Sequence, residues 1–374
     1  MNIAIIGHLR YPIGEPFAGG LEKHTHLLAT ELTRRGHKVT LYARPGSGPG
    51  YTVYPYDPAD YMTDPRIDLT VARQDAYNAI CDDIAAGDYD LIHNNSLHYV
   101  PMMRAHQLGA PVVQVLHTPM LDDLVSAAAI ARRHGSIRYI SVSDVTGRDW
   151  AEHIGEYEVV GNGIQLLRWR YSSRPVPGLV AYVGRIVPEK GVHLAIDAAR
   201  LAGKQMLIAG PLSDMDYFRE KIEPRLDEER RYVGHLKLLE TAQLLSNAEC
   251  SVFSSVWDEP FGLVLAESLT CGTPVAGFDV GAAREVLNDD TGVLVPEGDV
   301  EALAAAIHEA TQLDRRACRR RAMERFSLTA MVDAYEDIYR QEAKPRRIGE
   351  RSKGGLMFPA MAARASARKR QRRA

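Results

Sequence analysis

Short apolar runs alternate with helical segments along most of this 374-residue chain. In the first half, the segment Gly19–Arg35 is typical of a helix, because leucines recur at helical spacing and Gly36 follows as a stop. Strands that alternate with helices form a parallel sheet covered on both faces, so the pattern predicts an α/β fold. The strand-like runs of this half are Asn2–Gly7, Lys38–Ala43, Leu91–Asn94, Val112–His117 and Tyr139–Val142.

The alternation stops between Trp169 and Gly178, where serines and prolines gather, and then it restarts. We therefore predict two consecutive Rossmann-like domains: residues 1–168, a linker over 169–178, and residues 179–343, whose last helix can pack back on the first domain. In the second half we expect strands at Leu179–Val183, Gln205–Ala209, Arg231–Val233, Ser251–Ser254 and Pro274–Phe278, and helices at Val192–Leu201 and Leu263–Leu269. Since ligands of parallel sheets sit beyond the carboxyl ends of strands, two facing domains predict a deep cleft between them.

The composition is that of a soluble globular protein, with 45% apolar and 25% charged residues. No apolar run reaches about 18 residues, the length of a membrane span. Met1–Gly7 lacks a basic leader, so we interpret it as a first strand rather than a signal peptide. The four cysteines form no CxxC pair, which disfavours a metal site and a disulfide scaffold. We expect a cytoplasmic protein.

The C-terminal segment 344–374 differs in charge from the rest of the chain. It holds eleven of the 45 Lys and Arg but one of the 48 Asp and Glu, so it carries +10 and the remainder −13. Ala, Gly and Ser are frequent there without a sustained apolar face, so we expect disorder. Such a tail favours contact with an anionic membrane, which would place the protein peripherally at the inner face of that membrane. A merely solubilising role is an equal alternative. Nucleic acid is the less favoured partner.

Two glutamates bracket a turn and a helix start at Glu259-Pro260-Phe261-Gly262-Leu263-Val264-Leu265-Ala266-Glu267. We expect Pro260 in the first helical turn, where its missing N–H is no loss. The backbone N–H groups of Phe261, Gly262, Leu263 and Val264 would then favour an anionic phosphate, and Glu267 would reach a sugar attached to it. On its own, the pattern is also explained by a glutamate that offsets the helix dipole.

Glycines and cations precede two other predicted helices. Gly19-Gly20 opens the first long helix, where the missing side chains allow close approach to a ligand. Gly184-Arg185 and Lys190-Gly191 flank the loop after the first strand of the second domain, where a diphosphate would need positive charge. A dinucleotide site is disfavoured, because Gly7-His8-Leu9-Arg10-Tyr11 does not follow the GxGxxG pattern.

Taken together, these residues resemble the family 4 retaining glycosyltransferases of GT-B architecture. The resemblance covers roughly residues 1–340 and is carried by Gly19-Gly20 with Glu22 and His24, His117-Thr118, Ser141-Val142-Ser143, Asn162-Gly163-Ile164, Gly184-Arg185 with Lys190-Gly191, Ile208-Ala209-Gly210, Glu259 to Glu267, Cys271 to Val275 and Gly292 to Val295. The chain departs from the family pattern at Gln165, where Asp is common, and at Gly281-Ala282.

The resemblance implies a role for each matching residue. Arg185 and Lys190 would bind the donor diphosphate, Glu267 the nucleotide ribose, and Glu259 the donor sugar. His117 would hold a sugar hydroxyl near the anomeric carbon. Gly19, Gly20, Gly184 and the amides of Phe261, Gly262, Leu263 and Val264 would approach the diphosphate or the sugar.

The resemblance also implies transfer of a sugar from a nucleotide diphosphate sugar to a hydroxyl, with retention of anomeric configuration. It implies no cofactor and no obligatory metal, because cationic side chains and helix ends replace one. We favour a UDP-sugar, and the acceptor is a small molecule, a glycan or a lipid-linked hydroxyl met by loops at Gly46–Pro65 and Met120–His134. The alternatives are a non-catalytic nucleotide-sugar sensor or partner subunit, and a phosphorylase or epimerase of the same architecture.

Overall fold

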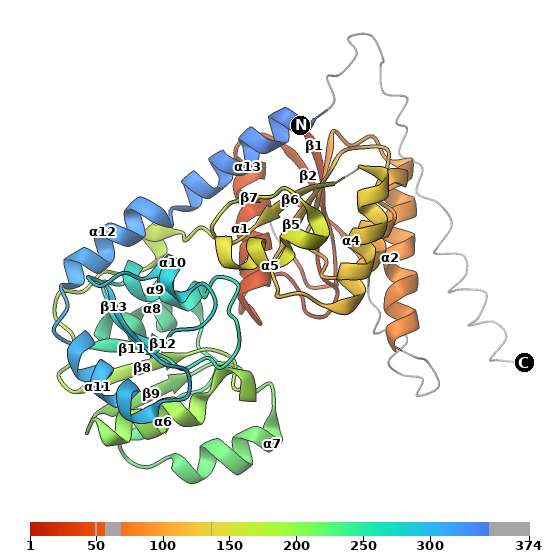
Figure 1. Cartoon of the computed structure of the whole chain (residues 1–374). Coiled ribbons are helices and arrows are strands. Elements are labelled where there is room, and N and C mark those ends of the chain that lie inside the picture. Colours follow the sequence, from red (N-terminus) through yellow and green to blue (C-terminus); the bar gives the residue numbers. More distant parts are fainter. Residues whose placement is uncertain (49–50, 57–68, 136, 344–374) are drawn as a thin grey trace, which may run out of the picture. The chain divides into compact units, whose positions relative to one another are not determined.

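The computed structural model describes residues 1–48, 51–56, 69–135 and 137–343. These residues belong to one compact unit, Met1–Ala343. Two β-sheets organise it (Figure 1), one of seven strands and one of six. The first is built from β1 (Asn2–Ile6), β2 (Lys38–Ala43), β3 (Thr52–Pro55), β4 (Leu91–Asn94), β5 (Val112–Leu116), β6 (Ile137–Ser141) and β7 (Glu158–Val159). The second is built from β8 (Leu179–Val183), β9 (Gln205–Ala209), β10 (Arg230–Tyr232), β11 (Cys250–Phe253), β12 (Val275–Phe278) and β13 (Gly292–Val295).

All strand pairs within the two sheets are parallel, as the α/β prediction required. The strand order is β3-β2-β1-β4-β5-β6-β7 in the first sheet and β10-β9-β8-β11-β12-β13 in the second. The order therefore reverses between β1 and β4, and again between β8 and β11. In an open parallel sheet these switch points, at the carboxyl ends of the strands, are where ligands bind.

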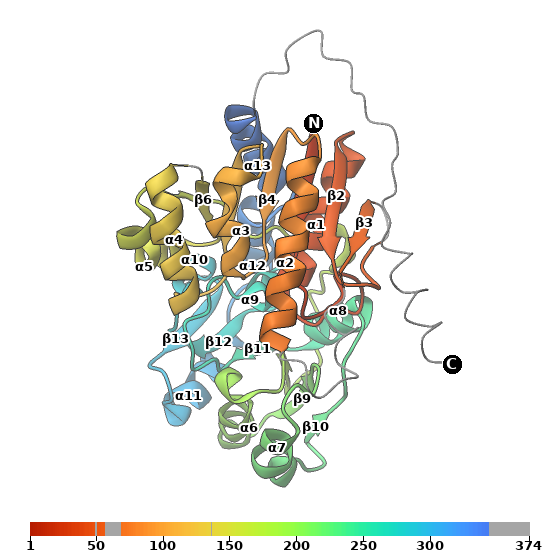
Figure 2. The same ribbon diagram turned by 90° about the vertical axis from the view of Figure 1, so that its right-hand side faces the viewer.

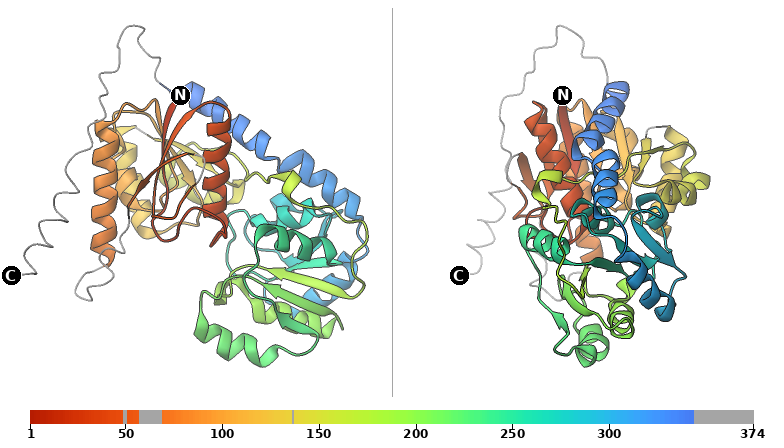
Figure 3. Two further views of the ribbon diagram at one scale, coloured as in Figure 1. Left: turned by 180° about the vertical axis from the view of Figure 1, so that it is seen from behind. Right: turned by 90° about the vertical axis from the view of Figure 1, so that its left-hand side faces the viewer.

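Helices cover both faces of the first sheet. In Figures 2 and 3, α2 lies on one face of the strands β1, β2 and β4, whereas α1 and α13 lie on the other. The helices of the first half are α1 (Gly20–Arg34), α2 (Leu69–Ala86), α3 (Tyr99–Met103), α4 (Asp122–His134) and α5 (Asp144–Ile154). Those that follow are α6 (Val192–Leu201), α7 (Met215–Tyr217), α8 (Leu238–Asn247), α9 (Leu263–Thr270), α10 (Ala283–Val286), α11 (Val300–Ala310), α12 (Arg315–Arg325) and α13 (Leu328–Glu342).

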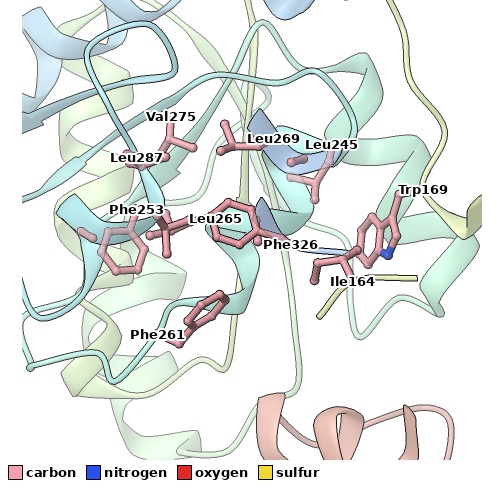
Figure 4. Close-up of a cluster of buried hydrophobic side chains, with 14 of the residues drawn as sticks. Ile164, Trp169, Leu245, Phe253, Phe261, Leu265, Leu269, Val275, Leu287 and Phe326 are labelled. Carbon is pink, nitrogen blue, oxygen red and sulfur yellow. The ribbon is translucent and has the colours of Figure 1, made fainter. Parts of the chain in front are cut away.

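One cluster of buried apolar side chains runs through both halves. Figure 4 shows the part of it around α9, where Phe261 meets the ring of Phe326 edge-on at 5.8 Å. Trp169 and Ile164, from the segment between the two sheets, belong to the same cluster and are at most 2% exposed. Burial of such large side chains stabilises each by about 1.5–3 kcal/mol, so this core fixes the start of α9 firmly.

The last helix returns to the first half of the chain. α13 packs against α1, where the Arg35 guanidinium donates to Glu336 at 3.0 Å and His37 lies 2.7 Å from the same carboxylate. In the preceding helix α12, Arg315 donates to the backbone carbonyls of Ser172, Ser246 and Ala248. These bonds satisfy carbonyls at the end of α8 and anchor the segment that connects the two sheets.

Three local predictions were wrong or fall outside the described residues. The segment Gly46–Pro65 was predicted as loop, but Thr52–Pro55 adds an edge strand beside β2, since backbone pairing overrides its Tyr- and Pro-rich composition. Met120–His134 is mostly the helix α4 rather than a loop, with acids in its first turn and Arg132, Arg133 and His134 in its last, as the helix dipole favours. The predicted disorder of 344–374 lies outside the described residues, and the domain boundaries at 168 and 178 stay predictions.

Candidate active site

Polar residues follow the strands on either side of the two switch points. His8 follows β1 and Asn95 follows β4 in the first sheet. In the second, Arg185 follows β8, and Ser255 follows β11 four residues before Glu259. Because parallel strands present their carboxyl ends at one edge, the topology gathers these polar groups where ligands of this fold class bind.

Lys190 and Glu259 form an ion pair that joins the two strand ends of the second switch point. The Lys190 Nζ donates to Glu259 Oε1, and the same oxygen accepts from the Ser255 hydroxyl at 3.0 Å. Glu259 is 8% exposed, so neither charge is well hydrated. The family resemblance implies separate roles for the two residues, phosphate contact and sugar contact, whereas in the structure each is the partner of the other.

The ammonium of Lys190 is tuned by its surroundings. Burial, first, and the positive charge of Arg185 lower the pKa of Lys190 to about 7, while Glu189 acts in the opposite direction. Arg185 itself is held by Glu189 at 3.4 Å and is 35% exposed at the side chain. Arg185 and Lys190 lie on one loop, so the loop favours the approach of an anion. A bound anion would stabilise the charged form of Lys190 and raise its pKa again.

The start of α9 differs from the prediction. The helix begins at Leu263, and Gly262 at its N-cap has a φ of 75°, a left-handed conformation that favours glycine. Pro260 therefore lies before the helix and not in its first turn, because the turn at Gly262 intervenes. Leu263 and Val264 are half-buried at the helix start, where the first N–H groups of a helix have no carbonyl one turn earlier to bond, whereas Phe261 is buried in the core.

Gly20 touches the start of α9 from the other half of the chain. A Cβ placed on Gly20 would lie 2.8 Å from Leu263 Cδ1, so the Leu263 side chain packs closely against residue 20 because that residue has no side chain. A Cβ on Gly19 would lie 3.1 Å from the Glu22 carboxylate. Gly184 is held in a similar way, since a Cβ there would lie 2.8 Å from the Tyr182 hydroxyl. The glycines predicted to approach a ligand thus also permit the close packing around the site.

Glu267, in the second turn of α9, forms a buried ion pair with Lys23 of α1. Both side chains are 10% exposed, and the Lys23 ammonium also lies 4.3 Å from the centre of the Trp169 ring. Lys23 was not among the predicted site residues. Its position three residues after Gly20 in α1 was the available signal, but nothing in the sequence connected it to a glutamate 244 residues away.

Glu22 and His8 form a second pair close to the cationic loop. His8 Nε2 lies 2.8 Å from Glu22 Oε1, and both side chains are at most 10% exposed. Burial raises the pKa of Glu22, but the hydrogen bond and charge of His8, with a contribution from Arg185, outweigh it and lower that pKa overall. A carboxylate of the first half is thus electrostatically coupled to a predicted phosphate ligand of the second.

His117 lies at the end of β5 in a network of first-half residues. Its Nε2 is 2.9 Å from Asn95 Oδ1, and its ring meets that of His24 edge-on with centroids 4.7 Å apart. Burial, and then the neighbouring histidines His24, His93 and His8, hold the pKa of His117 well below its usual range. The imidazole is therefore neutral near pH 7 and can exchange hydrogen bonds but carries no charge.

Glu285, shortly after the departure from the family pattern at Gly281-Ala282, supplies a further contact between the two halves. Its carboxylate, on α10, accepts from the backbone N–H of Asp144 at 2.9 Å and of Val145 at 2.7 Å. It therefore caps the first turn of α5, where a negative charge offsets the helix dipole. Arg321 in turn donates to the carbonyls of Glu285 and Val286, which fixes α10.

Two family models match the chain. Residues 18–168 match the family model described as Glycosyltransferase Family 4, and residues 165–325 match that of Glycosyl transferases group 1. The chain is 28% identical over 380 residues to a glycogen synthase of Mycobacterium tuberculosis, which covers 86% of this chain and 91% of that protein. It is 28% identical over 312 residues to a phosphatidyl-myo-inositol mannosyltransferase of Mycolicibacterium smegmatis, which covers 77% and 80%.

Solved structures share the fold at lower sequence identity. Sucrose-phosphate synthase from Thermosynechococcus elongatus superposes with a TM-score of 0.77 at 22% identity and covers 91% of this chain and 98% of its own. HepE of Anabaena, solved with UDP and glucose, superposes with a TM-score of 0.73 at 19% identity and covers 91% and 100%. Since the two family models together span residues 18 to 325, the chain belongs to the group 1, family 4 glycosyltransferases, and it is a glycosyltransferase of GT-B fold.

Proposed function

We propose that this glycosyltransferase moves a sugar from a nucleotide diphosphate sugar, with UDP as the favoured nucleotide, to an acceptor hydroxyl with retention of configuration and without a metal ion. The observation that carries the proposal is the Lys190–Glu259 pair beside the first turn of α9, with Arg185 on the same loop. Lys190, Arg185 and the backbone N–H groups at the start of α9 would bind a diphosphate, and the Glu259 carboxylate would bind a sugar. UDP is favoured because HepE, a neighbour in fold, was solved with UDP and with UDP-glucose.

In the proposed reaction, the acceptor hydroxyl attacks the anomeric carbon from the face on which the diphosphate leaves. The bond between the anomeric carbon and the phosphate oxygen breaks, the new glycosidic bond forms, and the departing diphosphate takes the proton of the hydroxyl. Negative charge accumulates on the leaving oxygen, where Lys190 and Arg185 stabilise it more than in the ground state. Glu267 would hold the ribose, and His117 a hydroxyl of the transferred sugar.

Calorimetric titration with UDP, GDP and ADP tests the donor part of the proposal. We expect micromolar binding of one nucleotide and a loss of affinity in Lys190→Ala. Lys204→Ala is the matched control, because Lys204 forms a comparable ion pair with Glu249 at 2.7 Å. These two residues precede β9 and β11, so the pair lies at the amino ends of the strands, opposite to the proposed site. If the protein binds all three nucleotides and Lys190→Ala leaves their affinities unchanged, the proposed site is contradicted.

Turnover measurements test the catalytic part. Loss of one cation at the leaving group should raise the barrier by about 2–4 kcal/mol, by analogy with the loss of one oxyanion donor. The anomeric configuration of the product, followed by NMR, decides whether configuration is retained, and activity in excess EDTA decides the question of the metal. Tight nucleotide binding without turnover for any acceptor would instead favour the non-catalytic sensor or partner subunit.

The acceptor and the basic segment 344–374 need separate tests. The proposed acceptor is a small molecule, a glycan or a lipid-linked hydroxyl, and the tail is proposed to contact anionic lipid, since each Lys or Arg near such a surface contributes about 1 kcal/mol. Among the described residues no helix is long and apolar enough to cross a membrane. Cosedimentation with anionic liposomes that is the same with and without residues 344–374 would rule out the lipid contact.

A further inference from the structure

We propose that Tyr339, acting through His93 and Asn95, fixes the tautomer of His117 so that its Nε2 carries the proton and its Nδ1 is a bare hydrogen-bond acceptor. Tyr339 is then a positioning residue for the sugar site, supplied by helix α13. The proposal rests on the proposed function in so far as His117 holds a hydroxyl of the transferred sugar. The tautomer itself is a property of the protein without ligand.

The four residues form a continuous chain of short contacts. Tyr339 Oη, on α13, lies 2.7 Å from His93 Nδ1 in β4. His93 Nε2 lies 3.0 Å from Asn95 Oδ1, and His117 Nε2 lies 2.9 Å from the same oxygen. Tyr339, His93 and Asn95 are completely buried, so water does not compete for these contacts.

The direction of each hydrogen bond follows from the orientation of the Asn95 amide. In the structure its Nδ2 donates to Thr25 Oγ1 at 3.1 Å, and its Oδ1 is the atom that lies between the two histidines. An amide oxygen carries no hydrogen and only accepts, so both His93 and His117 must donate from Nε2. A neutral imidazole carries one N–H, and the Nδ1 of each ring is therefore bare.

Tyr339 completes this arrangement at the other end. The bare Nδ1 of His93 needs a donor in the buried interior, and the hydroxyl of Tyr339 is that donor. Without it, the bare Nδ1 of His93 is buried with no donor, which offsets the hydrogen bond from Nε2 to Asn95, so the ring can turn or change tautomer. Asn95 would then lose one of the two donors that hold its amide in place, and the preference at His117 would weaken.

Both histidines are neutral, which the tautomer argument requires. Burial and the nearby His24 hold the pKa of His93 at about 3, and burial with the surrounding histidines holds that of His117 well below its usual range. His117 therefore accepts a hydrogen bond at Nδ1 and does not protonate a leaving group. Its ligand is a hydroxyl that donates a hydrogen bond, the chemistry that every sugar offers.

The neighbouring Tyr335 provides a matched control on the same helix. It is as buried as Tyr339 and its ring also meets that of His93, with centroids 5.3 Å apart, but its hydroxyl has no hydrogen-bond partner among the described residues. Replacement of each tyrosine by Phe removes one hydroxyl and nothing else. Any effect specific to Tyr339→Phe is then an effect of its bond to His93.

The test is ¹⁵N NMR of the full chain labelled at histidine, which distinguishes protonated from bare ring nitrogens. A His117→Gln spectrum identifies the His117 signals. We expect a bare Nδ1 and a protonated Nε2 in the wild type and in Tyr335→Phe, and a mixture of tautomers in Tyr339→Phe. A protonated Nδ1 at His117 in the wild type, or a Tyr339→Phe spectrum equal to that of the wild type, overturns the proposal.

Kinetics add a readout that a purely structural role would not give. At equal stability, Tyr339→Phe should lower kcat by about tenfold or more, as expected when a catalytic imidazole is held in the wrong tautomer, whereas Tyr335→Phe should not. Equal losses in the two variants would overturn the proposal. The NMR result needs no substrate, so absence of any transfer activity would count against the proposed function and leave the tautomer assignment standing.

Discussion

Lys23 and Glu267 form a buried ion pair although 244 residues separate them in the chain. The pair joins α1 to α9. Its carboxylate, that of Glu267, is the group that the family resemblance implies would bind the nucleotide ribose. Removal of one partner from a buried pair leaves an uncompensated charge, which typically costs about 3–5 kcal/mol. Lys23→Met should therefore lower the free energy of unfolding by that amount in denaturant titrations. The double variant Lys23→Met with Glu267→Leu should recover much of the loss. Equal stability of the single variant Lys23→Met and the double variant would contradict the pairing.

Nucleotide affinity should depend on pH through Lys190. Its pKa of about 7 in the free protein means that the ammonium loses its proton just above neutrality, whereas a bound diphosphate stabilises the charged form and raises that pKa. Binding then takes up a proton, and affinity should fall by up to about tenfold per pH unit above pH 7. The second ionisation of a phosphate, near pH 6, is complete over this range. Calorimetry from pH 7 to 9 measures the slope.

Lys190→Arg is the informative variant for this pH dependence. A guanidinium keeps its charge throughout the range, so the slope should disappear even if the affinity itself changes. A slope that persists in Lys190→Arg would assign the titration to another group.

Acid should destabilise the protein through its buried histidines. The pKa of His93 is lowered to about 3 and that of His24 to about 4, in both cases chiefly by burial. In the unfolded chain both titrate near 6.5, so below that pH the unfolded state binds more protons and stability falls as pH falls. Each histidine should remove roughly 1–2 kcal/mol between pH 7 and pH 5. His93→Gln should show a shallower acid dependence in urea titrations, whereas the exposed His106→Gln should match the wild type.

The cap that Glu285 places on α5 should contribute measurably to stability. Glu285→Ala leaves the N–H groups of Asp144 and Val145 without their partner, which should cost about 0.5–2 kcal/mol, the usual range for a lost N-cap. Thermal unfolding measures it. The exposed Glu301, in the first turn of α11, is the control, and Glu301→Ala should change stability by less than about 0.5 kcal/mol.

Gly281 should be needed for the position of Glu259. A Cβ at residue 281 would lie 2.4 Å from the backbone nitrogen and oxygen of Glu259, and its φ is 50°. Gly281→Ala should therefore displace Glu259 and weaken nucleotide-sugar binding as well as stability. Gly298 shares a positive φ of 79° but has nothing within 4 Å, so Gly298→Ala should cost only the backbone strain of about 1–2 kcal/mol. Equal effects of the two variants on binding would contradict this role.

Local patterns in the sequence predicted the strands and helices that carry the site. Short apolar runs located β1, β8 and β11, and the motif from Glu259 to Glu267 located α9 to within a few residues. The exact start of α9 was missed, because a glycine can adopt either a helical or a left-handed conformation and the sequence does not distinguish them. β3 was missed because an edge strand of this composition depends on pairing with β2 rather than on its own propensity.

The sequence by itself determined the α/β class, the two sheets and the residue types of the proposed nucleotide-sugar site. These follow from periodicity and motif spacing, which are properties of neighbouring residues. Only the tertiary structure decided that Lys190 pairs with Glu259, that Lys23 reaches Glu267, and that Tyr339 stands behind His93. Such pairs form between strand ends and helices distant in the chain, and the partner of a buried charge or donor is set by which elements pack together, not by what lies beside it in the sequence.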